Sequence, residues 1–245
     1  MCPQINFTEK LHPARFWERP NRFLLRCTLE DNPTSPHNIS GEMVDVHLAD
    51  PGRLKELLIP GKRIWLCPAS SPKRRTKWSA ALVENPEGTA LISIDSTLPN
   101  RLVAKALTED ALPVFRDWEL KKAEHKMGNS RFDFLLNNGS GQMALEVKSV
   151  TLVKDGVALF PDAITIRGAK HVHELAEIAT RPDWSAAILF VVQREDAYRV
   201  LAAPEIDPHF ATTLDNARQQ GVQIKGVRCK VTPDAVALDK LIPAE

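Results

Sequence analysis

The sequence has few cysteines and no long apolar run. Its four cysteines stand singly without a Cys-x-x-Cys pair, which argues against a zinc site and, in a reducing compartment, against disulfide bonds. The start of the chain has no apolar core of a signal peptide, and no later run reaches the length that spans a bilayer. We therefore expect a cytoplasmic protein with no membrane segment. The cysteines are Cys2, Cys27, Cys67 and Cys229.

Net charge is also nearly absent. A formal charge of +1 excludes a global basic field, so any surface for nucleic acid has to come from local clustering. No helix-turn-helix or zinc-finger pattern is present, which gives little support to sequence-specific reading of the major groove. What the chain does have is length and apolar content, 245 residues of which 43% are hydrophobic, enough for one large domain or two small ones.

Two alternating runs in the middle of the chain predict a β-hairpin. Residues 131–135 and 144–148 flank the sequence Asn137-Asn138-Gly139-Ser140-Gly141, whose Asn-Gly pair suits the positive φ angles of a tight turn. Because strand side chains alternate between faces, Glu146 and Lys148 are expected on one face, with Leu145 and Val147 on the core face. On the first strand the same rule places Asp133 on one face with Arg131 and Leu135. The other face then carries Phe132, Phe134 and Leu136.

The hairpin brings two carboxylates and an ammonium to one edge of a sheet. Asp133 and Glu146 can hold Mg²⁺ or Mn²⁺ by oxygen ligands, and Lys148 would act as a point charge beside the attacking water or the scissile phosphate. This D…ExK pattern resembles the PD-(D/E)xK nuclease fold. The bare tripeptide is a weak signal, since it also occurs at Glu119-Leu120-Lys121 and Glu124-His125-Lys126. A structural ion pair on a half-exposed sheet is the alternative.

The first half of the chain predicts a small five-stranded barrel of the OB type. Short strands are expected at 23–30, 41–48, 63–68, 77–84 and 90–94. Between the second and third strands, Asp50 can cap a short helix that ends before Pro60-Gly61.

Two segments of this half concentrate basic residues near aromatic ones. The segment 11–26 mixes arginines, including Arg22, with Phe16, Trp17 and Phe23, and the loop 70–78 holds four cations beside Trp78. Either segment can grip phosphates, and in both the alternative is a solvated surface. The four cations of the loop are Lys73, Arg74, Arg75 and Lys77.

The second half predicts an α/β unit around the hairpin. Helices are expected at 100–109, 167–180 and 208–220, and strands at 121–127, 186–192 and 222–231. His171 and His173 do not share a helix face, which excludes them as a zinc pair. Arg167, Lys170 and His171 lie within one turn of a helix start, where they can serve a substrate phosphate, or merely face solvent.

The chain resembles the sugar fermentation stimulation protein A family of bacteria and archaea over roughly residues 15 to 230. The matching pieces include Pro51-Gly52-Arg53, Asn100-Arg101-Leu102-Val103, Gly128-Asn129-Ser130-Arg131-Phe132-Asp133-Phe134, Glu146-Val147-Lys148-Ser149-Val150-Thr151 and Phe160-Pro161-Asp162-Ala163, followed by Arg167-Gly168 and Lys170-His171. The resemblance implies an OB-like barrel, residues 1–97, joined to a PD-(D/E)xK restriction-endonuclease-like domain, residues 98–245. It also implies DNA binding and a regulatory role in sugar (maltose) metabolism.

Carried over to this chain, the resemblance makes Asp133 and Glu146 metal ligands, Lys148 the catalytic lysine and Glu124 a further carboxylate ligand. One departure is Lys105, which stands where similar proteins have an acidic residue; if that residue helps to hold the metal, the change weakens the case for cleavage. DNA, bound without strong sequence specificity, is the expected partner. Its candidate contacts are Arg22, Arg53, Lys73, Arg74, Arg75, Lys77, Arg131, Arg167, Lys170 and His171.

Three hypotheses therefore stand. The first is a DNA-binding protein with a Mg²⁺-dependent nuclease centre at Asp133, Glu146 and Lys148. The second is a regulator that binds DNA through its barrel and basic loop without cleaving it. The third is a protein-interaction module in which the carboxylates and the lysine form only an ion pair.

Overall fold

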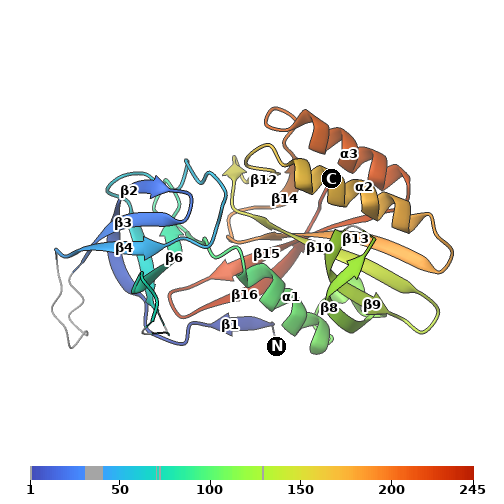
Figure 1. Ribbon diagram of the computed structural model, residues 1–245, viewed down its shortest axis with the longest axis horizontal. Helices are drawn as coiled ribbons and strands as arrows, with labels where there is room; N and C mark the ends of the chain where they lie inside the picture. The colour runs from blue at the N-terminus through green and yellow to red at the C-terminus, as the bar shows by residue number, and fades with distance from the viewer. Residues whose placement is uncertain (1, 31–40, 70, 72, 129) are drawn as a thin grey trace.

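The computed structural model describes residues 2–30, 41–69, 71, 73–128 and 130–245, and it consists of a β-barrel packed against an α/β domain (Figure 1). Ser70 and Pro72 of the predicted basic loop, and Asn129 of the motif before Asp133, lie outside the described residues. Within the described ranges no helix combines the length and the apolar character needed to cross a membrane.

Five strands close into the barrel. In the order β4-β3-β2-β5-β6 each strand is hydrogen-bonded to the next, and a parallel pairing of β4 with β6 closes the ring. Buried and exposed residues alternate along the strands, as in β3, where Leu25, Cys27 and Leu29 are buried, so that one face of the ring fills the interior. The strands are β2 (His12–Asn21), β3 (Leu24–Leu29), β4 (Met43–His47), β5 (Arg63–Pro68) and β6 (Trp78–Glu84), followed by β7 (Leu91–Ser93).

The predicted OB-like barrel is confirmed, but the set of strands that forms it differs from the prediction. The basic segment before residue 23 supplies β2, which pairs with both β3 and β5, whereas β7 pairs only with β6 outside the ring. The short helix predicted after Asp50 is wrong. Leu54 has a φ of +48°, which interrupts a right-handed helix, and the segment forms a turn instead.

The α/β domain is built on a seven-stranded sheet with the strand order β1-β16-β15-β13-β10-β9-β8. Its centre is parallel, because β13 runs parallel to both β10 and β15. The strands are β1 (Gln4–Asn6), β8 (Glu119–Met127), β9 (Ser130–Asn137), β10 (Gln142–Val150), β13 (Trp184–Val192), β15 (Gln223–Val231) and β16 (Ala235–Ile242). A small sheet of β11 (Val153–Lys154), β12 (Val157–Phe160) and β14 (Arg199–Ala202) stands beside it.

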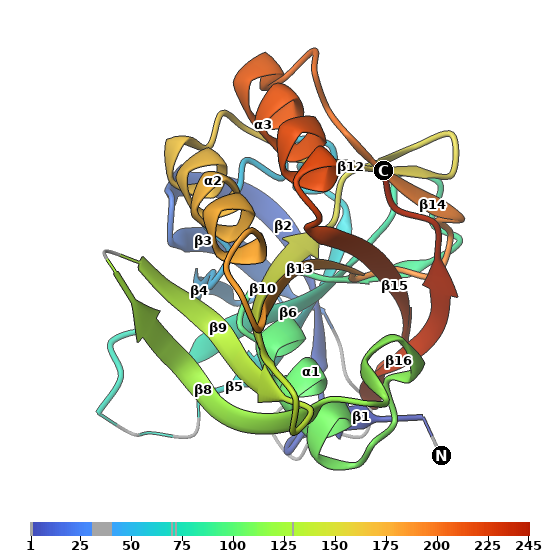
Figure 2. The same cartoon turned by 90° about the vertical axis from the view of Figure 1, so that its right-hand side faces the viewer.

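Helices cover both faces of the large sheet (Figure 2). The helices α2 (Ile166–Ala179) and α3 (Pro208–Gln219) pack on one face, and α1 (Leu98–Thr108) packs on the other, followed by the short 3₁₀ helix η1 (Pro113–Phe115). Since β13 lies between these two layers, its apolar run is buried on both sides, as the sequence predicted.

The barrel and the sheet share a hydrophobic core. Leu11 and Leu82 of the barrel side belong to the same buried cluster as Leu102 of α1. A hydrogen bond of 3.0 Å from the Ser93 amide to the Gln193 carbonyl also joins the two parts. The barrel is therefore packed firmly beside the domain that carries the predicted site.

The N-terminal strand does not belong to the barrel. β1 pairs antiparallel with β16, so residues 4–6 form the edge of the large sheet. The predicted division at residues 97 and 98 stays a prediction, with the qualification that the chain before the barrel contributes to the second domain.

Candidate functional site

The predicted hairpin is confirmed as β9 and β10. The two strands pair from Asn137 with Gln142 to Phe134 with Leu145. In the connecting turn, the Asn138 side-chain oxygen accepts hydrogen bonds from the amides of Ser140 and Gly141, and Gly139 has a φ of +83°. The Asn-Gly signal thus fixes the place where the chain reverses.

Beyond this pairing the hairpin opens at Asp133. The next position on β10 has no partner on β9; instead the Asp133 carboxylate accepts a hydrogen bond of 2.7 Å from the amide of Val147. The neighbouring strand is distorted at the same level, where Glu124 has a φ of +52°. A side chain therefore replaces the strand ladder at this point.

This opening overturns the simple alternation predicted for β9. Phe132 packs in the core under α2, while Phe134 packs in the core with α1, although the two were expected on one face. The departure from regular pairing around Asp133 is the physical reason, because strict alternation holds only along a regular strand. The alternation predicted for β10 is confirmed: Leu145 and Val147 belong to the α1-side core, while Glu146 meets His171 of α2.

A second neighbour of Asp133 was not predicted. The side-chain amide of Asn100, in the first turn of α1, donates a hydrogen bond of 2.7 Å to the other oxygen of Asp133. The sequence contained a signal in the Asn100-Arg101 pair at the predicted helix start, but only the fold brings that start to β9. Both oxygens of the Asp133 carboxylate are consequently held by defined donors.

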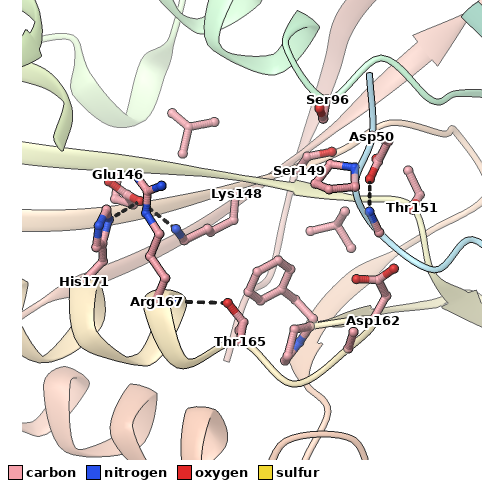
Figure 3. A pocket seen from close by; sticks show the side chains of 18 of the residues that line it. Asp50, Ser96, Glu146, Lys148, Ser149, Thr151, Asp162, Thr165, Arg167 and His171 are labelled. Atoms are coloured by element: carbon pink, nitrogen blue, oxygen red, sulfur yellow. Dashed lines mark hydrogen bonds and ion pairs between the residues drawn. The ribbon is translucent and has the colours of Figure 1, made fainter. Parts of the chain in front are cut away.

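Glu146 is buried and shares one oxygen between two donors. Its Oε1 lies 2.6 Å from Nζ of Lys148 and 2.8 Å from Nδ1 of His171 on α2 (Figure 3). Its Oε2 is buried with no hydrogen-bond partner among the described residues. An ionised carboxylate oxygen that is shielded from water and unpaired requires a positive partner, so this atom marks the point where a cation fits best.

The surroundings shift the pKa values of the two carboxylates in opposite directions. Burial raises the pKa of Asp133 and the negative charge of Glu146 raises it further, against the lowering effect of the Val147 amide, Lys148 and Asn100. Burial also acts to raise the pKa of Glu146, but the hydrogen bond from His171 and the charge and hydrogen bond of Lys148 outweigh it, and the pKa is lowered. Such divergence between neighbouring acids is typical of functional sites.

A cleft of about 540 Å³ opens over this group. Its floor contains Asp133, Glu146 and Lys148, and the segment 159–168 with the start of α2 forms a wall. The barrel contributes Asp50, Pro51, Gly52 and Ser96, so the cleft lies between the barrel and the α/β domain.

A second pair of acids lies at the other end of the cleft (Figure 3). The Asp50 carboxylate accepts a hydrogen bond of 2.7 Å from the Gly52 amide, and the Asp162 carboxylate accepts one of 2.9 Å from the Arg53 amide. Burial raises the pKa of Asp50 to about 6. The pair joins the barrel loop to the wall of the cleft, a role that the sequence did not reveal.

Arg19 fixes the same barrel loop. Its guanidinium donates to the carbonyls of Gly52 and Arg53 at 2.7 and 2.8 Å, and also to that of Arg22 at 2.7 Å. These bonds engage both terminal nitrogens of this arginine and hold the loop against the barrel.

The predicted phosphate-binding residues separate into three groups. Arg131 and Arg167 line the cleft, and with Lys126 and Lys170 they also line a neighbouring hollow of about 390 Å³. Arg22 and Arg53 line a hollow on the barrel side, which shares Pro51 and Gly52 with the cleft. The third group lies on the β5–β6 loop, outside the residues that line the cleft: Lys73, Arg74, Arg75 and Lys77.

Three further residues lie differently from the simplest expectation. His171 is buried against Glu146. Glu124 lies at the cleft but its side chain is 70% exposed and pairs with Arg131 at 3.3 Å. Lys105 is not among the residues lining the cleft; its ammonium donates to the Gln4 carbonyl at 3.1 Å. Lys105 thus lies at the contact between α1 and β1.

The residues of the floor fit a hard divalent cation. Asp133 and Glu146 are oxygen donors, and Mg²⁺ is commonly held by one or two carboxylates with water and substrate phosphate completing its shell. In the part of the chain that the structure describes, no group of three or more His, Cys, Asp or Glu side chains is arranged to hold a metal by itself. A cation here would leave positions open for a substrate.

Comparison with known proteins identifies the family. The family described as the SfsA N-terminal OB domain matches residues 18–94, and the sugar fermentation stimulation protein RE domain matches residues 97–235. The chain belongs to the SfsA family. Its relatives include the sugar fermentation stimulation protein homologs of Shouchella clausii, 42% identical over 95% of this chain and 97% of the relative, and of Moorella thermoacetica, 42% identical over 96% of each.

The family fold is also seen in a solved structure. An SfsA protein from Pyrococcus furiosus, described in complex with Ca²⁺, superposes with a TM-score of 0.85 and covers 100% of this chain and 99% of its own. At 23% identity this likeness concerns the fold. The SfsA arrangement of an OB-like barrel and an α/β domain is therefore retained here across a wide divergence in sequence.

Proposed function

We propose that this SfsA-family protein binds DNA and cleaves phosphodiesters at a centre that depends on Mg²⁺ or Mn²⁺. The observation that carries the proposal is the pair of carboxylates, the half-buried Asp133 and the buried Glu146, beside Lys148 on the floor of an open cleft. The similar Pyrococcus furiosus protein is described in complex with Ca²⁺, which prefers the same oxygen ligands as Mg²⁺ and so supports the proposal.

Each residue has a distinct part. Asp133 and Glu146 would hold the cation, Glu146 through the Oε2 atom that has no other partner. A cation bound there supplies charge stabilisation and an activated water for attack at phosphorus. Lys148 is held by Glu146 at 2.6 Å and would place its positive charge beside that water or the scissile phosphate.

Basic residues on both sides of the cleft support a polyanionic substrate. Arg22 and Arg53 lie on the barrel side, and Arg131 and Arg167 lie on the other. A strand crossing the carboxylates would meet positive charge before and after the reaction centre, which compensates for the nearly neutral chain as a whole. These contacts carry no base recognition, in keeping with binding of little sequence specificity.

The physiological part of the proposal is a regulatory role in sugar (maltose) metabolism. Its support is the name shared by the relatives. No residue of the site argues for a sugar ligand, so the regulation would be exerted through DNA.

The test titrates Mn²⁺ and Mg²⁺ into the protein with fluorescent duplex and single-stranded DNA present, so that binding and cleavage are followed together. Asp133→Ala/Glu146→Ala is compared with Asp117→Ala/Glu119→Ala, which removes two exposed acids outside the cleft. We expect the first variant to lose metal-dependent cleavage while keeping most of its DNA affinity, and the control to keep both. Cleavage that persists in the first variant, or wild-type protein that binds DNA without metal uptake or cleavage, would refute the nuclease centre.

The slope of log affinity against log salt concentration tests the DNA contacts separately. Each phosphate contact contributes roughly one unit to that slope. We expect Arg131→Ala/Arg167→Ala to reduce the slope by about two units. The triple change of Lys73, Arg74 and Arg75 to alanine tests the β5–β6 loop in the same way, and an unchanged slope would exclude that loop.

A further inference from the structure

Two isoleucines stand largely exposed beside the cleft. Ile164 is 71% exposed and Ile166 is 82% exposed. Among the large hydrophobic residues that the structure describes, these two are the most exposed. Ile164 is one of the residues that line the cleft. Because burial of an apolar side chain is favourable, two isoleucines left in water beside a binding site favour a ligand that covers them.

The backbone around these residues is fixed. The Thr165 amide donates a hydrogen bond of 2.8 Å to Asp207, and the Thr165 hydroxyl accepts one of 3.0 Å from the Gly168 amide as the N-cap of α2. Thr165 itself has φ of −131° and ψ of 82°. The two exposed isoleucines that flank it therefore form an apolar projection on a backbone that hydrogen bonds hold in place.

The charged residues near this projection indicate which kind of ligand it can bind. Arg167 follows Ile166 directly and lines the cleft, and Lys170 lies one turn further on the same face of α2. Lys126 and Arg131 complete this basic margin. Arg131 pairs with Glu124 at 3.3 Å, and because both side chains are exposed a phosphate can replace this acid at little cost. Lys170 lies 3.7 Å from the largely buried Glu174, but its own side chain is 54% exposed and can reach a phosphate.

An apolar tip set among cations matches a nucleic-acid strand better than an acidic protein surface. The cations take the phosphates, and the faces of bases offer the flat apolar surface that aliphatic side chains cover. Proteins that kink duplex DNA insert isoleucine between base steps and must first unstack the bases. Unpaired bases expose the same faces without that step. We propose that Ile164 and Ile166 form a wedge that packs against unpaired bases, so that the preferred substrate of the cleft is DNA with a single-stranded stretch.

This inference rests on the proposed function, and it deepens it by naming the form of the substrate. Ile164 lines the wall of the cleft and Ile166 lies between the lining residues Thr165 and Arg167, while the carboxylates lie on the floor. Unpaired bases held at the wall would leave the backbone of the same strand over Glu146 and Lys148. Cleavage is thus expected in or next to the single-stranded part.

The experiment measures binding in EDTA, where no metal-dependent cleavage takes place. Two fluorescent DNAs of the same sequence are used, a full duplex and a duplex with a single-stranded overhang, the latter with 2-aminopurine at its first unpaired position. Wild-type protein is compared with Ile164→Ser/Ile166→Ser. Ile59→Ser, which changes a 37% exposed isoleucine of the barrel loop, is the control.

We expect the double variant to lose about tenfold in affinity for the overhang DNA, with little change for the full duplex, and to lose the 2-aminopurine fluorescence change. The control should behave as wild type. Equal losses on both DNAs, or no loss on either, would overturn the wedge, as would an unchanged 2-aminopurine signal. These outcomes are independent of the metal titration, because the wedge can fail while cleavage still depends on Asp133 and Glu146, and the reverse holds as well.

Discussion

Nδ1 of His171 lies 2.8 Å from Oε1 of Glu146, and the side chains of both residues are only 6% exposed. The contact ties the start of α2 to the middle of β10. It also fixes the rotation of the carboxylate, so that Oε2 is left free on the same group. We therefore expect His171 to act as a positioning residue in the proposed metal site, while its predicted contact with the DNA backbone stays a prediction.

The first prediction concerns this contact. His171→Leu should weaken Mn²⁺ binding about tenfold or more, because the neighbours of metal ligands commonly contribute that much, while His171→Asn, whose amide can donate from nearly the same position, should recover most of the affinity. Isothermal titration with Mn²⁺ measures both. His173→Leu, an exposed histidine two residues further on, is the control. An Asn variant as weak as the Leu variant would contradict the positioning role.

The second prediction concerns the charge of Glu146 acting on Asp133. Burial and the Glu146 carboxylate both raise the pKa of Asp133, so Glu146→Gln should lower that pKa by removing the second cause. Carboxyl ¹³C NMR of the metal-free protein across pH measures the shift. Glu124→Gln changes an exposed acid at the same cleft and should leave the Asp133 titration where it is. If the two variants titrate alike, the two floor carboxylates do not interact.

The third prediction follows from Asp50. Its pKa is about 6 in the folded protein against about 3.9 when unfolded, so the folded state binds more protons between these values. The stability due to this group is fully present below pH 4 and is lost as pH rises through 6. Asp50→Asn keeps an oxygen for the Gly52 amide and removes the buried charge. Its free energy of unfolding should exceed that of wild type by about 2–3 kcal/mol above pH 7, with the gain vanishing near pH 4.

Urea denaturation at several pH values measures this difference. Asp117→Asn is the matched control, because it removes the same charge from an exposed position. If Asp50→Asn raises the free energy of unfolding by the same amount at pH 4 and at pH 7, the ionisation of Asp50 is not the source of the added stability.

The fourth prediction uses Gly52, where the barrel loop meets the cleft wall. A Cβ at this position would lie 2.6 Å from an oxygen of Asp162 and 2.8 Å from one of Asp50. Gly52→Ala should therefore destabilise the fold by about 1–3 kcal/mol through overpacking. In the Asp162→Ala background, Gly52→Ala should lower the free energy of unfolding by less. A double-mutant cycle measured by urea denaturation gives the interaction energy between positions 52 and 162. Strict additivity of the two changes would exclude a direct contact.

Local patterns were sufficient to predict the hairpin and the gathering of Asp133, Glu146 and Lys148 on it. These features depend on alternation and turn chemistry within about twenty residues, and the same local rules found most strands of the barrel. They failed at Leu54, where one residue with positive φ prevents a helix, and at Asp133, where the strands separate. Both are single backbone departures that periodicity does not register.

Contacts between residues that are far apart in the chain could not be predicted from the sequence, because only the fold brings them together. Asn100 meets Asp133 because α1 begins beside β9, and His171 meets Glu146 because α2 crosses β10. Asp50 and Asp162 are far apart in the chain and lie on opposite sides of the joint between the two domains. The types of these residues were visible, but their partners depend on long-range packing.

The pairing of β1 with β16 has a consequence for how the chain folds during synthesis. β1 leaves the ribosome long before β16, and the whole barrel and most of the sheet are made between them. Because β16 pairs with β15 on one side and with β1 on the other, residues 4–6 can join the large sheet only after β16 has formed. The pairing also means that the chain connects the barrel to the α/β domain twice, once between β1 and β2 and once between β7 and α1.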